Sequence, residues 1–348
     1  MRINYERINL FAGIANLSSN IKIFDLSRDD IEHLCRFFGL GDLCYYEKEK
    51  GVSVSHYNAV VFMATTKGQY ILKFYPPNSA KSIVTEYILN HLLLHHHFLT
   101  PTMYADLRGQ PFCPSNNRLV TCYSYIDGEQ AWQTITKPNT FTQINTTLLS
   151  LKNILSTTRV QLPFPKQRSL PAAISSLTQD SKNIIPSDHQ KVILASLLEA
   201  GRTFRKYKRL FTRQVLHCNT HLDSFLISKG GIYTLDLSHV QEDYILTDLR
   251  NMIISCLLVN MPTPTVRNII QDYLTRHGIA SQHSLVLDTL VKMSLVKNYL
   301  MNARYERSLE LYINPKEDAR PHRSFLLKRK KFIIVLLKKV NRFPILRV

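Results

Sequence analysis

Residues 215–236 carry the side chains best suited to chemistry in this chain. A short apolar stretch leads into a polar loop, and a second apolar stretch ends at an acidic residue, Asp236. Asp223 supplies a second carboxylate, and Asn219 and Ser224 add an amide and a hydroxyl to the same loop. The segment therefore has the layout of a catalytic loop between two strands.

The N-terminal part of the chain is expected to form a sheet with helices that position this loop. Residues 28–38 have a helical pattern that begins at Ser27, a good N-cap residue. A second helix is predicted over 79–96, where apolar residues recur on one face. Turn residues separate the predicted strands, which indicates an antiparallel meander. These strands are 43–48, 58–65, 70–75, 111–113 and 118–125.

After about residue 138 the pattern becomes mostly helical. The predicted helices are 140–157, 188–211, 243–261, 264–277, 284–310 and 322–340. The polar segment interrupts them, and residues 161–187, rich in Pro, Ser and Lys, are expected to form a loop. This order predicts an α+β protein with an N-terminal lobe over 1–126, which includes an N-terminal helical extension, and a helical lobe over 127–348.

Composition narrows the class of protein. The chain has 348 residues, 45% apolar residues and a net charge of +18, so it can bury a core and present a basic surface. Six scattered cysteines without a C-x-x-C pair predict reduced thiols in the cytoplasm. No signal peptide is predicted at the N-terminus. The longest apolar runs are far shorter than the ~20 residues that span a bilayer.

The spacing of His217, His221 and Asp236 matches the pattern His-Gly-Asp-x-His-x-x-Asn followed by Ile/Leu-Asp-Phe/Trp. Asp248-Leu249-Arg250 matches the Asp-Leu-Ala/Arg motif that usually follows this pattern. Further motifs fall in order upstream: Gly39-Leu40-Gly41-Asp42, residues 51–55, Tyr70-Ile71-Leu72-Lys73, Glu86 and Tyr123 to Gly128. Over about residues 30–310 the chain thus resembles the aminoglycoside phosphotransferase family, with its choline-kinase-like and type II homoserine-kinase-like enzymes. The resemblance implies a protein kinase-like bilobal fold, with an antiparallel sheet plus helix in the N-lobe and a mostly helical C-lobe.

The resemblance also implies a site for ATP and Mg²⁺. Lys73 would hold nucleotide phosphates, and Glu86 would pair with Lys73 and fix its reach. Asp236 would bind Mg²⁺. The phosphate loop and the adenine-binding hinge would supply backbone groups from the following residues: Gly51, Ser53 and Ser55 in the loop, and Tyr123 and Tyr125 in the hinge. His217 joins Asn219 as a candidate catalytic residue, although a structural role is expected for both His217 and His221.

Three departures from the family pattern fall within the loop. Asn219 stands where the family has its catalytic Asp, and an amide cannot accept the proton of an acceptor hydroxyl, although it can still orient that hydroxyl. Ser224 replaces the second metal-binding residue, Asn, so Asp223 next to it is the alternative carboxylate. Cys218 replaces a Gly and would shift the loop backbone. These changes favour weak or absent catalysis.

Three hypotheses follow. The first is an ATP-binding pseudokinase whose role is to bind a ligand or to regulate a protein partner. The second is an active kinase that phosphorylates a hydroxyl of an unknown small-molecule acceptor, such as an amino alcohol or an aminoglycoside-like compound. The third is an adaptor for anionic membrane or nucleic acid through residues 316–348, where eleven Lys and Arg residues accompany two acidic ones in a basic amphipathic pattern. The same pattern fits a final helix packed on the helical lobe.

Overall fold

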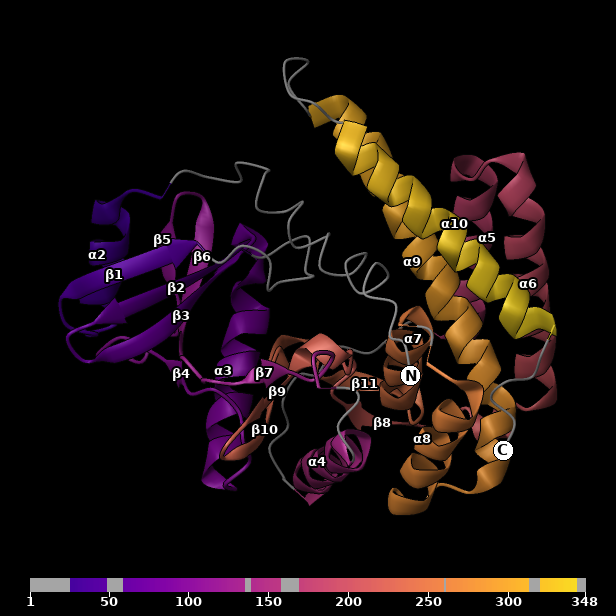
Figure 1. Ribbon diagram of the computed structural model, residues 1–348, viewed down its shortest axis with the longest axis horizontal. Coiled ribbons are helices and arrows are strands. Elements are labelled where there is room, and N and C mark those ends of the chain that lie inside the picture. The colour runs from indigo at the N-terminus through magenta and orange to yellow at the C-terminus, as the bar shows by residue number, and fades with distance from the viewer. Residues whose placement is uncertain are drawn as a thin grey trace. The chain divides into compact units, whose positions relative to one another are not determined.

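A computed structural model describes residues 26–48, 59–134, 139–157, 169–259, 261–312 and 320–342. These residues form two compact units (Figure 1). The sheet unit contains the described residues of 26–157 together with 222–240, and the helical unit contains those of 169–221 and 241–342. The predicted lobe boundary after residue 126 stays a prediction.

The sheet unit is built on an antiparallel sheet with the strand order β1-β2-β3-β6-β4, to which β5 adds beside β6. The strands are β1 (Leu43–Lys48), β2 (Ala59–Thr65), β3 (Gly68–Tyr75), β4 (Met103–Tyr104), β5 (Cys113–Ser115) and β6 (Arg118–Ser124). Lys73 in β3 lies opposite Val60 in β2 and Thr121 in β6. The predicted antiparallel meander is therefore present, and β4 is an additional strand.

The two faces of this sheet pack against different helices because side chains alternate along a strand. One face carries Tyr70, Leu72 and Phe74 of β3 and shares a core with helix α2 (Arg28–Phe37). The other face carries Tyr75, which packs in a core with Ile83 of helix α3 (Ala80–His95). The period of two therefore directs Lys73, two residues before Tyr75, to the α3 face.

Helix α2 begins at the residue that the sequence predicts. The Ser27 hydroxyl accepts a hydrogen bond from the Asp30 backbone N–H at 3.1 Å, and the Asp30 carboxylate accepts one from the Ser27 N–H at 2.9 Å. This reciprocal capping box satisfies two amide groups at the start of the helix.

A second, smaller sheet in the sheet unit carries the polar loop residues. Its order is β10-β9-β7, with β7 (Glu129–Gln130), β9 (Phe225–Ser228) and β10 (Gly231–Thr234). The hairpin of β9 and β10 follows the short helix η3 (Leu222–Ser224) and precedes η4 (Leu237–His239). Helix η1 (Pro77–Ser79) leads into α3, and helix α4 (Thr140–Thr157) packs against β10. Ser224 and Asp236 thus lie at the two open ends of one hairpin.

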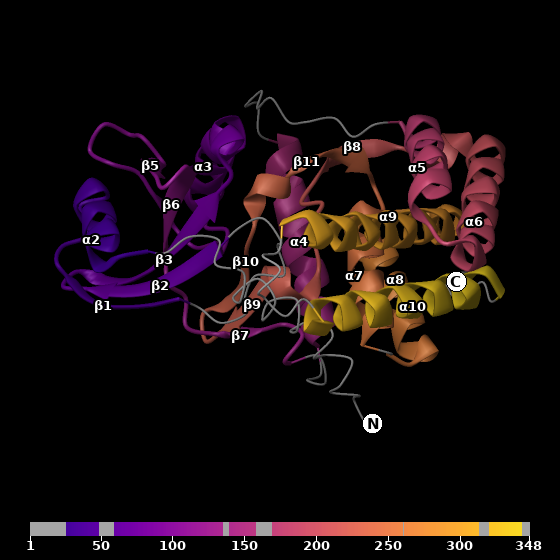
Figure 2. The ribbon, with the colours of Figure 1, turned by 90° about the horizontal axis from the view of Figure 1, so that it is seen from above.

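The helical unit consists of six long helices and one two-stranded sheet within its described residues. The elements are α5 (Leu170–Ile184), α6 (Ser187–Lys206), η2 (Lys208–Leu210), β8 (Arg213–Leu216), β11 (Gln241–Tyr244), α7 (Thr247–Leu258), α8 (Thr263–Arg276), η5 (Ser281–His283), α9 (Ser284–Tyr312) and α10 (Arg320–Arg342). Figure 2 shows α10 beside α9, which also packs against α6. Strands β8 and β11 pair antiparallel just before and after the hairpin segment.

Two predictions about this unit were wrong. Residues 170–184 form α5 although a loop was predicted, because α5 packs on α6 and α9. Pro171 is tolerated in its first turn, where a missing N–H costs nothing. Residues 241–244 form β11 although a helix was predicted from residue 243, because pairing with β8 outweighs the local pattern. The predicted helices around 188–211, 264–277, 284–310 and 322–340 are present with shifted ends.

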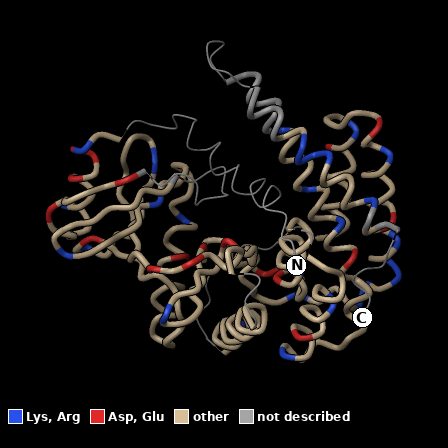
Figure 3. The backbone as a smooth tube through the Cα atoms, viewed as in Figure 1, with Lys and Arg blue, Asp and Glu red and all other residues tan. Residues whose placement is uncertain are grey.

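Helix α10 packs on the helical unit through its apolar side. Leu326, Ile333 and Leu337 are buried, and α10 contacts both α9 and α6. Lysines 328, 331 and 338 are exposed, whereas Lys330 is buried. Figure 3 shows the basic residues that α6 and α10 carry. Within the described ranges, no helix has both the length and the apolar character needed to cross a membrane.

Candidate functional site

An ion pair between Lys73 and Asp236 is the centre of the candidate site in the sheet unit. The Lys73 ammonium donates to a carboxylate oxygen of Asp236, and 8% of Lys73 is exposed. Burial by itself would lower the pKa of Lys73, but the carboxylates of Asp236 and Glu86 outweigh it and raise that pKa. Lys73 is therefore a buried cation at neutral pH, placed where it can meet an anion.

Two hydrogen bonds of Thr234 hold the end of the hairpin that leads to Asp236. Thr234 accepts a hydrogen bond from the Thr100 hydroxyl at 3.0 Å, and its N–H donates to the Leu99 carbonyl at 3.0 Å. These bonds attach the β9–β10 hairpin to the residues that follow α3. Asp236 itself has a left-handed backbone, with φ 57° and ψ 47°, immediately before η4. This turn directs its carboxylate to Lys73.

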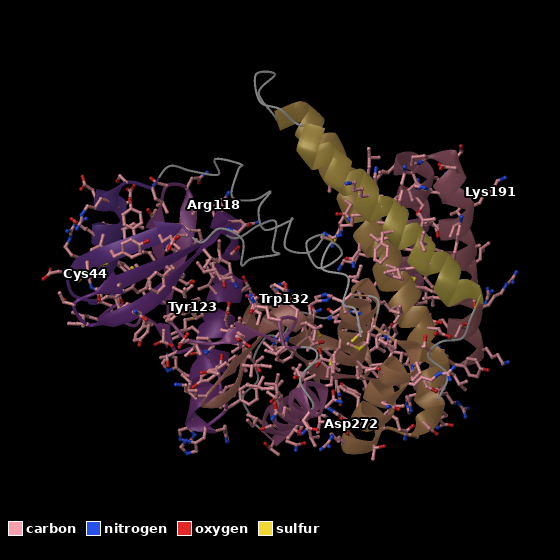
Figure 4. The ribbon with its side chains drawn as sticks, in the orientation of Figure 1. Cys44, Arg118, Tyr123, Trp132, Lys191 and Asp272 are labelled. Atoms are coloured by element: carbon pink, nitrogen blue, oxygen red, sulfur yellow. The ribbon has the colours of Figure 1, made fainter. Side chains whose placement is uncertain are left out.

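Glu86 of α3 lies buried behind Lys73 and takes its hydrogen bond from tyrosine. The Tyr75 hydroxyl donates to a Glu86 carboxylate oxygen at 2.9 Å and lies 3.3 Å from the Tyr123 hydroxyl. Figure 4 labels Tyr123 in the sheet unit. Burial raises the pKa of Glu86, while Lys73 opposes that rise. A direct Lys73–Glu86 pair was predicted, but the ion pair that Lys73 forms is with Asp236, and Glu86 acts on Lys73 through its field.

The predicted hinge residues are partly engaged in the sheet. Tyr123 pairs with Ile71 and Met103 on its two sides, and the Tyr125 N–H donates to the Gln69 carbonyl at 3.1 Å. The contact of this hinge with adenine stays a prediction. The predicted phosphate-loop residues lie outside the described residues: Gly51, Ser53 and Ser55.

Asp223 and Ser224 lie close to Asp236 within the sheet unit. Burial, and then the neighbouring Asp236 carboxylate, raises the pKa of Asp223 to about 6. The Ser224 carbonyl accepts the Leu235 N–H at 2.9 Å, which joins the two ends of the hairpin. Two carboxylates and a hydroxyl are hard oxygen donors that fit Mg²⁺. No group of three or more His, Cys, Asp or Glu side chains could hold a metal within the described residues, and Mg²⁺ commonly uses few protein ligands.

Asp248 anchors the loop that carries Asn219, in the helical unit. Its carboxylate accepts the Cys218 N–H at 2.8 Å and the His217 N–H at 3.3 Å. Its carbonyl accepts the Thr220 hydroxyl at 2.6 Å. The sequence pattern included Asp248 only as a matching step, so its anchoring role was missed.

Further bonds complete the loop. Asn251 donates to the Cys218 carbonyl at 2.8 Å, and the Asn219 N–H donates to His217 Nδ1 at 3.2 Å. His217 is fully buried, and His221 Nδ1 lies 3.2 Å from the Ser255 hydroxyl. Both histidines therefore have partners within the helical unit, and the roles predicted for them stay predictions. The loop is well built even though its central residue is an amide.

A comparison with protein families matches residues 49–284 to the phosphotransferase enzyme family, labelled APH. That match covers more than half of the 348 residues. The chain belongs to this family. A comparison with curated proteins gives no match.

Solved structures of the phosphotransferase family share the fold. An amicoumacin kinase in complex with AMP-PNP, Ca²⁺ and Ami is 12% identical, covers 96% of each chain and has a TM-score of 0.63. Spectinomycin phosphotransferase with ADP and spectinomycin is 13% identical, covers 92% of this chain and 100% of its own, and has a TM-score of 0.63. A choline kinase from Cryptosporidium parvum is 14% identical, covers 92% and 98%, and has a TM-score of 0.61. The predicted kinase-like α+β fold is confirmed.

Cys218 adopts a backbone conformation that suits the family's glycine. Its φ is +63°, in the left-handed region, where a side chain costs roughly 1–2 kcal/mol. Replacing Cys218 by Gly should therefore raise the free energy of unfolding by about 1 kcal/mol, measured by urea denaturation. Cys218→Ala keeps the strained side chain and loses the thiol, which lies 3.7 Å from the Gln241 carbonyl. Equal stability of the two variants would contradict strain as the cause.

Asp248 should make the stability of this protein depend on pH. Burial raises its pKa from 3.8 to about 6, although the N–H groups of Cys218 and His217 oppose that rise. Between about pH 4 and pH 6 the unfolded chain binds fewer protons at this site than the folded chain, so stability falls as pH rises. Relative to Asp248→Asn, wild type should lose up to about 3 kcal/mol across this window. Parallel profiles of unfolding free energy against pH would contradict this.

Proposed function

We propose that this protein is an ATP-binding member of the family whose phosphoryl transfer is weak or absent, that is, a pseudokinase or a weak phosphotransferase. The observation that carries the proposal is the buried Lys73–Asp236 pair beside Glu86. At this position the Lys73 cation suits the phosphates of a magnesium nucleotide, and the Asp236 carboxylate suits its metal ion. Asn219 stands at the position of the catalytic Asp in the same chain.

Lys73 would bind phosphate oxygens, and Asp236 with Asp223 would hold Mg²⁺. Bound Mg²⁺ supplies charge neutralisation between the phosphates. Ser224, where the family has Asn, offers a shorter and weaker ligand, which leaves Asp223 as the second carboxylate. The residues of the site that would act on the nucleotide are thus one cation, Lys73, and two carboxylates, Asp223 and Asp236.

The proposed loss of activity comes from the missing general base at Asn219, while the loop backbone that carries this residue is intact. The Asn219 loop is anchored by Asp248 and Asn251, so its amide is presented on an ordered backbone. An amide can orient an acceptor hydroxyl but cannot take its proton. General-base loss typically costs on the order of 10²–10⁴ in rate. The protein would then act by binding nucleotide, with a ligand or a regulated protein partner as its target, in the cytoplasm.

An active small-molecule kinase is the alternative. Positioning supplies much of the acceleration in phosphoryl transfer, and the anchored loop retains positioning. Two of the solved structures hold AMP-PNP with Ami or ADP with spectinomycin, and the proposed acceptor is a hydroxyl of an amino alcohol or an aminoglycoside-like compound. A second alternative is a contact of α10 with anionic membrane or nucleic acid, favoured by its exposed lysines.

Melting temperature with and without MgATP tests the nucleotide proposal. A clear rise at millimolar MgATP is expected, because a ligand that binds only the folded state stabilises it. No rise at that concentration would exclude both nucleotide-based functions. Contact of the basic surface with anionic membrane or nucleic acid would then be the remaining hypothesis. Turnover of ATP with a panel of amino alcohols and aminoglycosides then separates a pseudokinase from a kinase, since active kinases reach about 1–100 per second.

A further inference from the structure

A tyrosine next to Lys73 decides which carboxylate Lys73 can reach. Tyr75 lies two residues after Lys73 in β3, on the same face of the sheet, and is 4% exposed. Its hydroxyl donates to Glu86 at 2.9 Å, and its ring centroid lies 5.0 Å from the Lys73 ammonium. A single side chain therefore touches both partners of the predicted Lys73–Glu86 pair.

Glu86 has every physical reason to attract Lys73. Its carboxylate is 2% exposed, so it has little access to water, and an unsatisfied buried charge is costly. The Tyr75 hydroxyl meets this need, and Tyr123 adds a second hydroxyl beside it. Burial raises the pKa of both tyrosines far above neutral pH, so both remain hydroxyl donors. The ammonium of Lys73 is left for Asp236.

We propose that Tyr75 is a positioning residue: by holding Glu86 it leaves Lys73 on Asp236, so the resting protein keeps its own metal-ligand carboxylate in an ion pair. This inference rests on the proposed function, because it takes Asp236 as a metal ligand and Lys73 as a phosphate ligand. It adds a resting state in which Lys73 and Asp236 form an ion pair with each other and must separate before either can bind its ligand.

The resting pair couples the two ligands. A nucleotide phosphate draws Lys73 away from Asp236, and a divalent cation draws Asp236 away from Lys73. Both events break the same ion pair, so the first ligand to bind removes a cost for the second. Metal and nucleotide should therefore bind with positive coupling, and by linkage each raises the affinity for the other by the same factor. A divalent cation alone should bind weakly.

Replacing Tyr75 by Phe tests the role of the hydroxyl. The variant keeps the ring and removes the donor, so Glu86 should turn to Lys73 and release Asp236. The affinity for Mn²⁺ alone, measured by electron paramagnetic resonance of free Mn²⁺, should rise about 3- to 10-fold, the scale of one typical hydrogen bond. The coupling between Mn²⁺ and ADP should fall by a similar factor.

Tyr70→Phe is the matched control. Tyr70 lies in the same strand, is buried on the opposite face, and packs edge-on against Tyr104 at 5.5 Å between ring centroids. Losing this hydroxyl should leave Mn²⁺ binding unchanged. Adding Glu86→Gln to Tyr75→Phe should abolish the gain, because a neutral amide does not compete for Lys73.

The outcomes separate the inference from the proposed function. If wild type binds Mn²⁺ neither alone nor with ADP, the metal-nucleotide site itself is wrong. If wild type binds Mn²⁺ with ADP but Tyr75→Phe matches wild type for Mn²⁺ alone, the Tyr75 inference is overturned and the proposed function stands. Should Tyr75→Phe fail to fold, the wild type itself tests the resting ion pair. Mn²⁺ should bind more weakly alone than in the presence of ADP, and equal affinity under the two conditions overturns the inference.

Discussion

Replacing Asn219 by Asp should raise the rate of ATP turnover by on the order of 10²–10⁴. The loop around Asn219 is already anchored by Asp248 and Asn251, so the new carboxylate would enter an ordered backbone. A carboxylate can accept the proton of an acceptor hydroxyl or of water, which the amide cannot. The measurement is phosphate release from MgATP, with water and with the acceptor panel.

Asn268→Asp is a suitable control for this change. Asn268 is exposed on α8, in the same unit, and the substitution adds the same charge outside the loop. It should leave turnover at the wild-type level. A wild type that already turns over at about 1–100 per second, with no gain from Asn219→Asp, would favour the active kinase over the pseudokinase.

Replacing Lys73 by Met should weaken nucleotide binding about 10- to 100-fold, which corresponds to the loss of one or two charge-assisted hydrogen bonds. Met has a similar length and no charge, so the fold of β3 should persist. The Asp236 side chain is about one-third exposed, so water can solvate it once Lys73 is gone. The loss should therefore appear in nucleotide affinity, measured by calorimetry with MgADP, more than in stability.

Lys81→Met provides the comparison. Lys81 is exposed in the first turn of α3, and its loss removes the same charge from the same unit. Nucleotide affinity should stay within about twofold of wild type, as expected for screened surface charge. Equal losses in both lysine variants would mean that net charge, and not the Lys73 site, governs binding.

The sequence alone was enough to predict much of the sheet unit. The residues of α2 and its Ser27 cap follow from local chemistry, because a cap and its hydrogen bonds lie within one turn. The alternation in β3 places Lys73 and Tyr75 on one face for the same reason. The spacing of His217, His221 and Asp236 pointed to the family that the comparison confirmed.

Helix α5 shows where local patterns mislead. Its Pro and Ser content predicted a loop, yet α5 packs on α6 and α9, and that packing decides its structure. Strand β11 exists only because β8 is there to pair with it. Interactions between segments far apart in the sequence cannot be read from either segment alone.

The partner of Lys73 shows most clearly what the sequence determined and what the tertiary structure determined. The sequence determined that Lys73, Glu86 and Asp236 would be the charged residues of one site, because their types and order follow a known pattern. Only the tertiary structure decided that Lys73 pairs with Asp236, which lies 163 residues away, while Tyr75 takes Glu86. The reason is physical: the partner of a buried charge depends on differences of a few ångströms between competing donors, and chain folding alone sets those distances.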